Sequence, residues 1–235
     1  MGRYGSISEG GLGSVAATER VSGFLRGVYG WMCAGLALTA LVAFYVAGTN
    51  WATTLAQNHW LLFALFIAQI GVVITLSAGA SRLSPGIATL LFLGYSALTG
   101  LTFSYLLLLY TGESIATTFM ITAGMFGALA LFGTTTSRSL AGWGQFLFMG
   151  LIGVVLASLI GLFWHSNALQ FLISFAGVIV FTGLTAYDAQ RLKHMALALP
   201  DGQTRTYAIV GALSLYLNFV NLFLMLLRFT GSRRD

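Results

Sequence analysis

The residues that could do chemistry in this chain are a few polar side chains within long apolar runs. Asp188 ends one such run, and Arg82 lies in a short turn between two others. Ionisable groups at membrane depth are costly, so each is a candidate for an ion pathway or a proton relay. Asp188 lies about 20 residues, or roughly 30 Å of helix, along its run, which places it at one mouth of a bundle. A second interpretation of Asp188 is an interfacial carboxylate that pairs with Arg191, one helical turn along.

The last apolar run carries a stripe of small and polar residues. Gly211, Ser214, Asn218 and Asn221 recur at intervals of three, four and three, which places them on one face of a helix. Such a face is expected to point into a bundle rather than at lipid. It could line a pathway, or it could supply interhelical hydrogen bonds of about 1 kcal/mol each. Both interpretations stay open.

The composition shows what kind of protein carries these residues. The 235 residues are 57% hydrophobic and only 7% charged, whereas a soluble domain is roughly 25% charged. So few charges cannot cover the surface of a soluble fold, which excludes a soluble enzyme, a nucleic-acid binder and a disordered scaffold. Cys33 is the single cysteine, so a disulfide framework is excluded too. We expect an integral membrane protein.

Seven apolar runs are long enough to be transmembrane helices, which need about 20 residues each. The fold expected is therefore all-α, a seven-helix transmembrane bundle over residues 23–230. We expect a flexible cytoplasmic tail at 1–22 and a short basic tail at 231–235. The seven runs are residues 28–47, 60–78, 85–110, 114–133, 144–163, 169–187 and 208–229.

The basic residues predict the orientation. Eight basic residues lie either before the first run or in every second loop that follows: Arg3, Arg20, Arg26, Arg82, Arg138, Arg191, Lys193 and Arg205. The alternate loops contain no lysine or arginine, so the N-terminus is expected in the cytoplasm. Arg228, Arg233 and Arg234 would then lie outside if the last run crosses the membrane. We favour crossing because the run is long enough, and the alternative is a re-entrant last segment.

Several segments together resemble a known family. They are residues 183–190 (GLTAYDAQ) and 211–228 (GALSLYLNFVNLFLMLLR), with Leu76-Ser77 and Arg82, residues 95–102 (YSALTGLT) and residues 122–127 (TAGMFG). Jointly they are similar to the Bax inhibitor-1 (transmembrane Bax inhibitor motif) family, in its bacterial inner-membrane branch. The resemblance covers the chain after its N-terminal tail.

The resemblance implies a seven-helix bundle whose last helix lies near the centre, ringed by the other six. It also implies a pH-sensitive calcium leak and a part in stress responses, whereas some bacterial relatives restrain a membrane-bound quality-control protease. In the family's leak mechanism, two aspartates on the last two helices share a proton and close a latch, and an arginine competes for them. Asp188 matches the first aspartate and Arg82 matches the arginine.

The chain departs from the family pattern at the second aspartate. The family reads Leu-Tyr-Leu-Asp-Phe, and this chain has Asn218 at the fourth position. Two adjacent carboxylates share a proton because both cannot ionise cheaply, and an amide removes that repulsion. The leak is therefore expected to depend weakly on pH between about pH 6 and 8, although the amide can still hydrogen-bond Asp188. Calcium prefers six to eight oxygen ligands, so Asp188 is expected to form only a weak, transit-type calcium site.

Two functions remain after these steps. The first is a pH-modulated calcium (cation) leak pathway or ion-homeostasis protein with the lipid bilayer and a cation as partners. The second is a non-enzymatic modulator of a membrane-bound protease complex, with the N-terminal tail as its handle. We do not expect an enzyme, because no second transmembrane aspartate completes a dyad and no His-Glu-x-x-His motif occurs. No cofactor and no nucleic-acid partner are expected.

Overall fold

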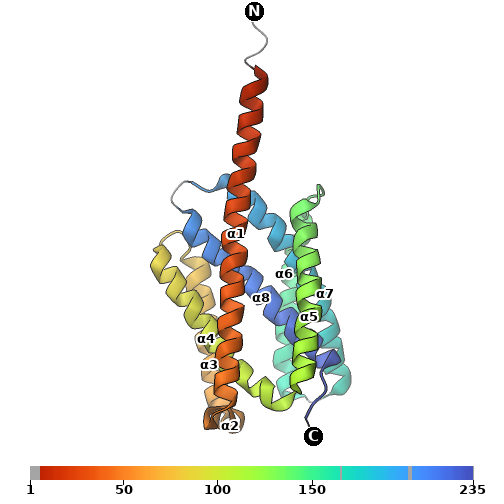
Figure 1. The fold of residues 1–235 in the computed structure, drawn as a ribbon. Coiled ribbons are helices and arrows are strands. Elements are labelled where there is room, and N and C mark those ends of the chain that lie inside the picture. Colours follow the sequence, from red (N-terminus) through yellow and green to blue (C-terminus); the bar gives the residue numbers. More distant parts are fainter. Residues whose placement is uncertain (1–5, 165, 201–202, 235) are drawn as a thin grey trace, which may run out of the picture.

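The computed structural model describes residues 6–164, 166–200 and 203–234, which form eight α-helices (Figure 1). Seven of these helices are long and apolar enough to cross a membrane, so the all-α membrane fold is confirmed. The helices are α1 (Ser6–Ala47), α2 (Asn50–Gln57), α3 (His59–Ala78), α4 (Pro85–Leu109), α5 (Gly112–Thr135), α6 (Ala141–Phe163), α7 (Asn167–Ala198) and α8 (Thr204–Thr230).

The first helix is longer than the sequence predicts. α1 begins at Ser6, so the described part of the expected tail is helical and continues the first span without a break. Its first turns extend beyond the rest of the bundle (Figure 1). Residues 6–22 contain no proline to interrupt a helix. The Arg20 guanidinium also donates to the Leu199 carbonyl at the end of α7, which fixes α1 ahead of the predicted boundary at residue 22. Residues 1–5 lie outside the described part of the chain.

α7 also continues past its predicted end at residue 187, through a polar stretch. Two side chains of that stretch, those of Gln190 and Lys193, bind neighbouring elements. The Gln190 amide accepts from the Leu140 backbone N–H at 2.7 Å and donates to the Arg138 carbonyl at 2.9 Å. Lys193 Nζ donates to the Thr134 carbonyl at 2.7 Å. α7 therefore supplies the partners that the end of α5 and the start of α6 need.

α2 is a short helix within what the sequence predicts as a loop. The Thr49 side chain accepts from the Trp51 backbone N–H and caps its N-terminus. Ala52 and Leu55 are buried on one side, and Trp51 is exposed on the other. This two-sided pattern in a helix of two turns lets α2 pack against α1, α3 and α4 at one end of the bundle.

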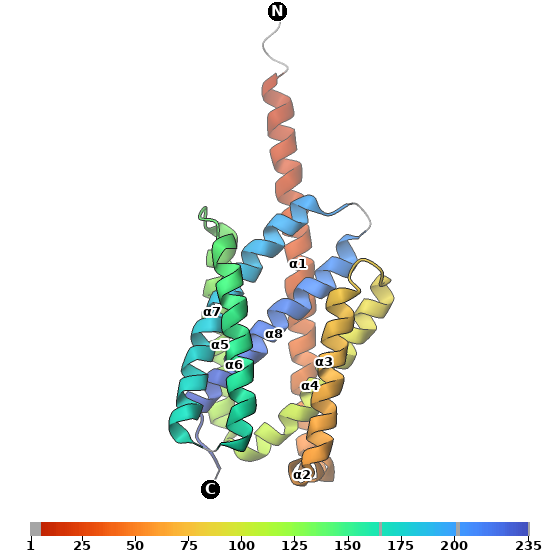
Figure 2. The same ribbon diagram turned by 180° about the vertical axis from the view of Figure 1, so that it is seen from behind.

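α8 is the central helix, as the family resemblance implies. Two-thirds (67%) of its most apolar stretch is buried inside protein, compared with 6% for α3. α8 packs against α1, α3, α4, α5 and α7, and it runs diagonally between these helices in Figure 2. The resemblance implies that six helices surround α8, but the structure departs from this at α6. The main neighbour of α6 is α7 and not α8.

The C-terminal segment is fixed at the end of the bundle opposite the start of α1 (Figure 1). Tyr110 and Arg233 form an antiparallel bridge between the α4–α5 turn and this segment. The Thr111 N–H donates to the Ser232 carbonyl at 3.1 Å, and the Arg234 N–H donates to the Leu109 carbonyl at 2.9 Å. α8 is therefore one unbroken helix that ends at this side of the bundle, as expected of a crossing helix. Residue 235 of the predicted basic tail lies outside the described residues.

α5 and α7 approach each other closely at Gly133. A β-carbon added there would overlap the Ala186 backbone, with the Ala186 Cα only 3.0 Å away. Ala186 lies in α7 two residues before Asp188. The absence of a side chain at Gly133 thus lets α5 hold α7 in place beside the candidate carboxylate, as small residues do in membrane helix packing.

We expect Gly133→Ala to destabilise the bundle by about 1–3 kcal/mol, because the added methyl group must push α5 and α7 apart. The measurement is the thermal unfolding midpoint of the purified protein in detergent. Gly127→Ala is the matched control, since nothing lies within 4 Å of a β-carbon at that position of the same helix. Equal midpoints for the two variants would contradict the close approach.

Candidate functional site

The structure brings Asp188, Ser214 and Asn218 together between α7 and α8. Asp188 is only 6% exposed. Its Oδ2 atom accepts one hydrogen bond from the Ser214 hydroxyl and one from the Asn218 side-chain amide, both at 2.8 Å. A buried carboxylate is costly unless it has such donors. These contacts join the last two spanning helices through a single oxygen atom.

The second oxygen of Asp188 faces Arg191. A nitrogen of the Arg191 guanidinium lies 3.4 Å from Asp188 Oδ1, one helical turn along α7. The arginine side chain is 46% exposed while the carboxylate is buried, so the pair lies where the protein interior meets its surroundings. The sequence suggests a pair of Asp188 with Arg191 as an alternative to a role of Asp188 inside the bundle. The structure has both this pair and the contacts of Asp188 with α8.

Arg82 does not reach this site. It is exposed in the loop between α3 and α4. In the described part of the chain its side chain makes neither an ion pair nor a hydrogen bond. Ser84, two residues later, caps α4 by accepting from the Ile87 N–H. The arginine beside the carboxylate in this structure is Arg191 instead of Arg82.

The remaining members of the α8 stripe have other roles. The Asn221 amide donates at 2.8 Å to the Leu217 carbonyl of its own helix, one turn back. Gly211 is buried against Leu192 of α7, where a β-carbon would lie 2.6 Å from a Leu192 methyl group. The predicted stripe therefore divides into a close-packing position, two donors to Asp188 and one side chain satisfied within α8.

A second polar cluster, which the sequence reasoning missed, lies on the other side of α8. The fully buried Tyr216 hydroxyl lies 2.6 Å from Thr39 Oγ1 of α1. Thr39 has one hydroxyl hydrogen, and the Gly35 and Ser96 carbonyls are the acceptors within its reach. Thr39 and Tyr216 therefore share a hydrogen bond in which either hydroxyl can be the donor.

Aromatic rings surround this tyrosine. The rings of Phe92 and Tyr95, both in α4, meet it edge-on at centroid distances of 5.8 and 5.7 Å, a favourable geometry for aromatic pairs. A signal for the cluster was present in the sequence. Tyr216 is two residues from Asn218, so their side chains point to nearly opposite faces of one helix.

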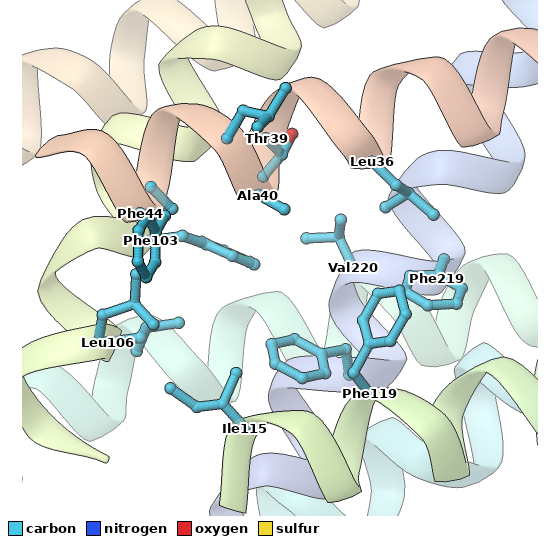
Figure 3. Close-up of a pocket in the computed structure, with 14 residues that line it drawn as sticks. Leu36, Thr39, Ala40, Phe44, Phe103, Leu106, Ile115, Phe119, Phe219 and Val220 are labelled. Atoms are coloured by element: carbon cyan, nitrogen blue, oxygen red, sulfur yellow. The ribbon is translucent and has the colours of Figure 1, made fainter. Parts of the chain in front are cut away.

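An apolar cavity of about 430 Å³ lies beside Thr39, between α1, α4, α5 and α8 (Figure 3). Leu36, Phe103, Phe119 and Phe219 line it together with Thr39 and further apolar side chains. The Thr39 hydroxyl is already hydrogen-bonded to its neighbours, so this lining offers too few oxygen ligands for a cation. The cavity does not include Asp188, Ser214 or Asn218, so it is separate from the polar contacts of Asp188.

The described residues contain no group of three or more His, Cys, Asp or Glu side chains able to hold a metal ion. At Asp188 the neighbouring side chains from α8 are a hydroxyl and an amide, and both donate to the carboxylate. A cation could use the carboxylate and the hydroxyl and amide oxygens only after these donors turn away.

We expect Asn218→Leu to destabilise the protein by about 1–2 kcal/mol, because one donor to a buried carboxylate is lost. Asn221→Leu is the matched control on the same helix, since that amide bonds only its own backbone. The measurement is the unfolding midpoint of each variant in detergent. The site geometry would be contradicted if Asn221→Leu cost as much as Asn218→Leu.

Comparison with known proteins agrees with the family resemblance. The family described as inhibitor of apoptosis-promoting Bax1 matches residues 21–235. The inner membrane protein YbhL of Escherichia coli (strain K12) is 53% identical over 215 residues, which cover 90% of this chain and 92% of the relative. A Deinococcus radiodurans protein is 44% identical over 216 residues, covering 92% and 93% of the two chains. A Borreliella burgdorferi protein is 43% identical over 215 residues, covering 90% and 93%. The chain therefore belongs to the Bax inhibitor-1 family.

Proposed function

We propose that this protein is a passive cation leak pathway that conducts calcium and is closed by Asp188. It acts without enzymatic chemistry in the bacterial inner membrane, with its N-terminus in the cytoplasm. The location is supported by the name of the Escherichia coli relative, an inner membrane protein, and by seven helices suited to cross a membrane. The orientation rests on the distribution of basic residues.

The observation that carries the proposal is the carboxylate shared between α7 and α8. Buried ionisable groups in membrane spans are costly and are therefore usually kept for function. Asp188 bonds Ser214 and Asn218 of the central helix, so separation of α8 from α7 would free the carboxylate for a passing cation. In this proposal, the arrangement in which Ser214 and Asn218 bond Asp188 corresponds to the closed state of the latch.

Asn218 determines how this latch responds to pH. The amide donates to an ionised carboxylate directly, so closure requires no shared proton. The family's two-aspartate pair needs such a proton, because two ionised carboxylates in contact repel each other. In this chain the closed state persists across the neutral range, and the leak responds weakly to pH.

The expected ion site is weak. Asp188 is the one acidic residue within α7 and α8, and calcium usually takes six to eight oxygens, several of them from carboxylates. The Ser214 hydroxyl and the Asn218 amide oxygen add neutral ligands if they rotate. Weak binding suits conduction, because an ion must leave a site as readily as it enters.

We expect Asn218→Asp to create a pH dependence that the wild type lacks. At about pH 6 the two carboxylates would share a proton and keep the latch closed; at about pH 8 both ionise, repel and open it. Calcium entry into liposomes should then rise several-fold from pH 6 to pH 8 in the variant and stay nearly constant in the wild type. Asp188→Ala should leak at every pH.

Asn221→Asp is the control for the added charge, since it places a carboxylate on α8 at a position that bonds only its own helix. It should not acquire the pH response of Asn218→Asp. The leak function would be refuted if none of these proteins, the wild type and Asp188→Ala included, passed calcium faster than empty liposomes do.

A second function, modulation of a membrane-bound quality-control protease, is supported by the start of α1. Its first turns extend past the ends of the other helices (Figure 1), which leaves a helical segment available to a partner. Arg20 is already used inside the protein, because it bonds the end of α7. A handle for a partner is therefore confined to residues before that arginine.

Deletion of residues 1–16 tests the second function without breaking the Arg20 contact. We expect the deletion to leave calcium flux unchanged, because the contacts of Asp188 lie within α7 and α8. Flux in liposomes and turnover of membrane-protease substrates in cells are measured on the same variant. Altered turnover with intact flux would favour the modulator, and unchanged turnover would count against it.

A further inference from the structure

A polar cavity of about 400 Å³ lies at the C-terminal end of α8, away from Asp188. It is bounded by the start of α7, the end of α8 and the C-terminal segment. The residues that line it are Tyr110, Ser166, Asn167, Gln170, Phe171, Ser174, Arg228, Phe229, Gly231 and Arg233. None of the functions considered above uses this cavity.

The cavity is positively charged. Arg228 and Arg233 line it, and the described residues of its lining include no aspartate or glutamate. In the described part of the chain neither guanidinium has an ion-pair partner. Two unpaired guanidinium groups beside one cavity match the planar, two-pronged geometry in which arginine binds phosphate oxygens.

The start of α7 adds further donors. α7 begins at Asn167, so the end of the helix that carries unpaired N–H groups and partial positive charge faces the cavity. Ser166 caps this helix by accepting from the Leu169 N–H. The amide side chains of Asn167 and Gln170 also line the cavity. Each of these groups can donate to an anion.

Ser174 is an independent indication that a ligand belongs in the cavity. It is 2% exposed and lines the cavity. Its hydroxyl has no hydrogen-bond partner among the described residues. Native proteins rarely leave a buried hydroxyl unpaired, and such a group usually indicates a missing partner. An oxygen of a bound anion would accept this hydrogen.

The ring pair of Phe171 and Phe229 points to an amphiphilic ligand. These rings meet edge-on at 5.3 Å, and both line the cavity while they remain exposed on its outer side. An apolar wall beside a cationic one suits a molecule that has a phosphate next to hydrocarbon. An anionic phospholipid has this combination, whereas a free phosphate ion uses only the cationic wall.

We propose that this cavity binds a phosphate-bearing anion, held by Arg228 and Arg233 and by the Ser174 hydroxyl. The ligand chemistry is that of a phosphate group with net negative charge, either in an anionic lipid headgroup or as the free ion. Binding would fasten the start of α7 to the end of α8. The site is separate from the Asp188 latch, which lies in the second half of α7 and near the middle of α8.

The test measures the thermal unfolding midpoint of the full chain in detergent during titration with dioleoyl phosphatidylglycerol, dioleoyl phosphatidylcholine or inorganic phosphate. We expect phosphatidylglycerol to raise the midpoint and phosphatidylcholine, which has no net charge, to do so far less. Arg228→Gln/Arg233→Gln should weaken the apparent affinity about tenfold or more, as loss of charged bonds to an anion does. Ser174→Ala should weaken it several-fold.

Arg26→Gln/Arg138→Gln is the matched control, because it removes the same charge from exposed positions outside the cavity. A response to inorganic phosphate alone would identify the free ion, and a response to phosphatidylglycerol alone would identify the headgroup. The proposal is overturned if neither probe raises the midpoint of the wild type. Equal weakening by the cavity and control variants would overturn it as well.

Discussion

The carboxylate of Asp188 is the group on which the rest of the arrangement depends. A buried ionised oxygen needs donors, and here they come from two residues of α8 and one of α7. To supply them, α7 and α8 must lie side by side at one fixed register. The close contact of α5 at Gly133 then fixes α7 from its other side. Helix packing in this half of the molecule follows from satisfying one charge.

α8 is polar on two opposite faces, and this explains its central place. Asn218 points to α7, and Tyr216 points to Thr39 of α1 and to the aromatic rings of α4. Among the described residues, α1 to α4 pack mainly with one another, and so do α5 to α7. α8 contacts both groups. A smaller direct contact between the groups is that of α1 with α7. The polar bonds of one helix therefore join two halves that otherwise touch little.

The sequence predicts the parts of this structure that rest on local patterns. The apolar runs give the seven spans, and helical spacing gives the face of Ser214 and Asn218. Spacing also gives the Asp188–Arg191 pair, whereas the closeness of Asp188 and Asn218 is implied only by the family resemblance. Arg82 lies apart from Asp188 because its position depends on a loop, whose direction no periodicity encodes, and its part in the latch stays a prediction. Tyr216 was missed because its partner Thr39 is far away in the chain. The polar end of α7 looked like a loop, since the acceptor of Gln190 lies in the α5–α6 loop and that of Lys193 at the end of α5.

The pairing of the C-terminal segment with the α4–α5 turn determines how α8 can move. A helix hydrogen-bonded at one end can tilt about that end, but it cannot slide along its axis without breaking the bridge of Tyr110 and Arg233. In a tilt, displacement grows with distance from the fixed end. Ser214 is farther from that end than Asn218, so it would move away from Asp188 first. The carboxylate would lose its donors one after the other, in an order set by where the chain is anchored.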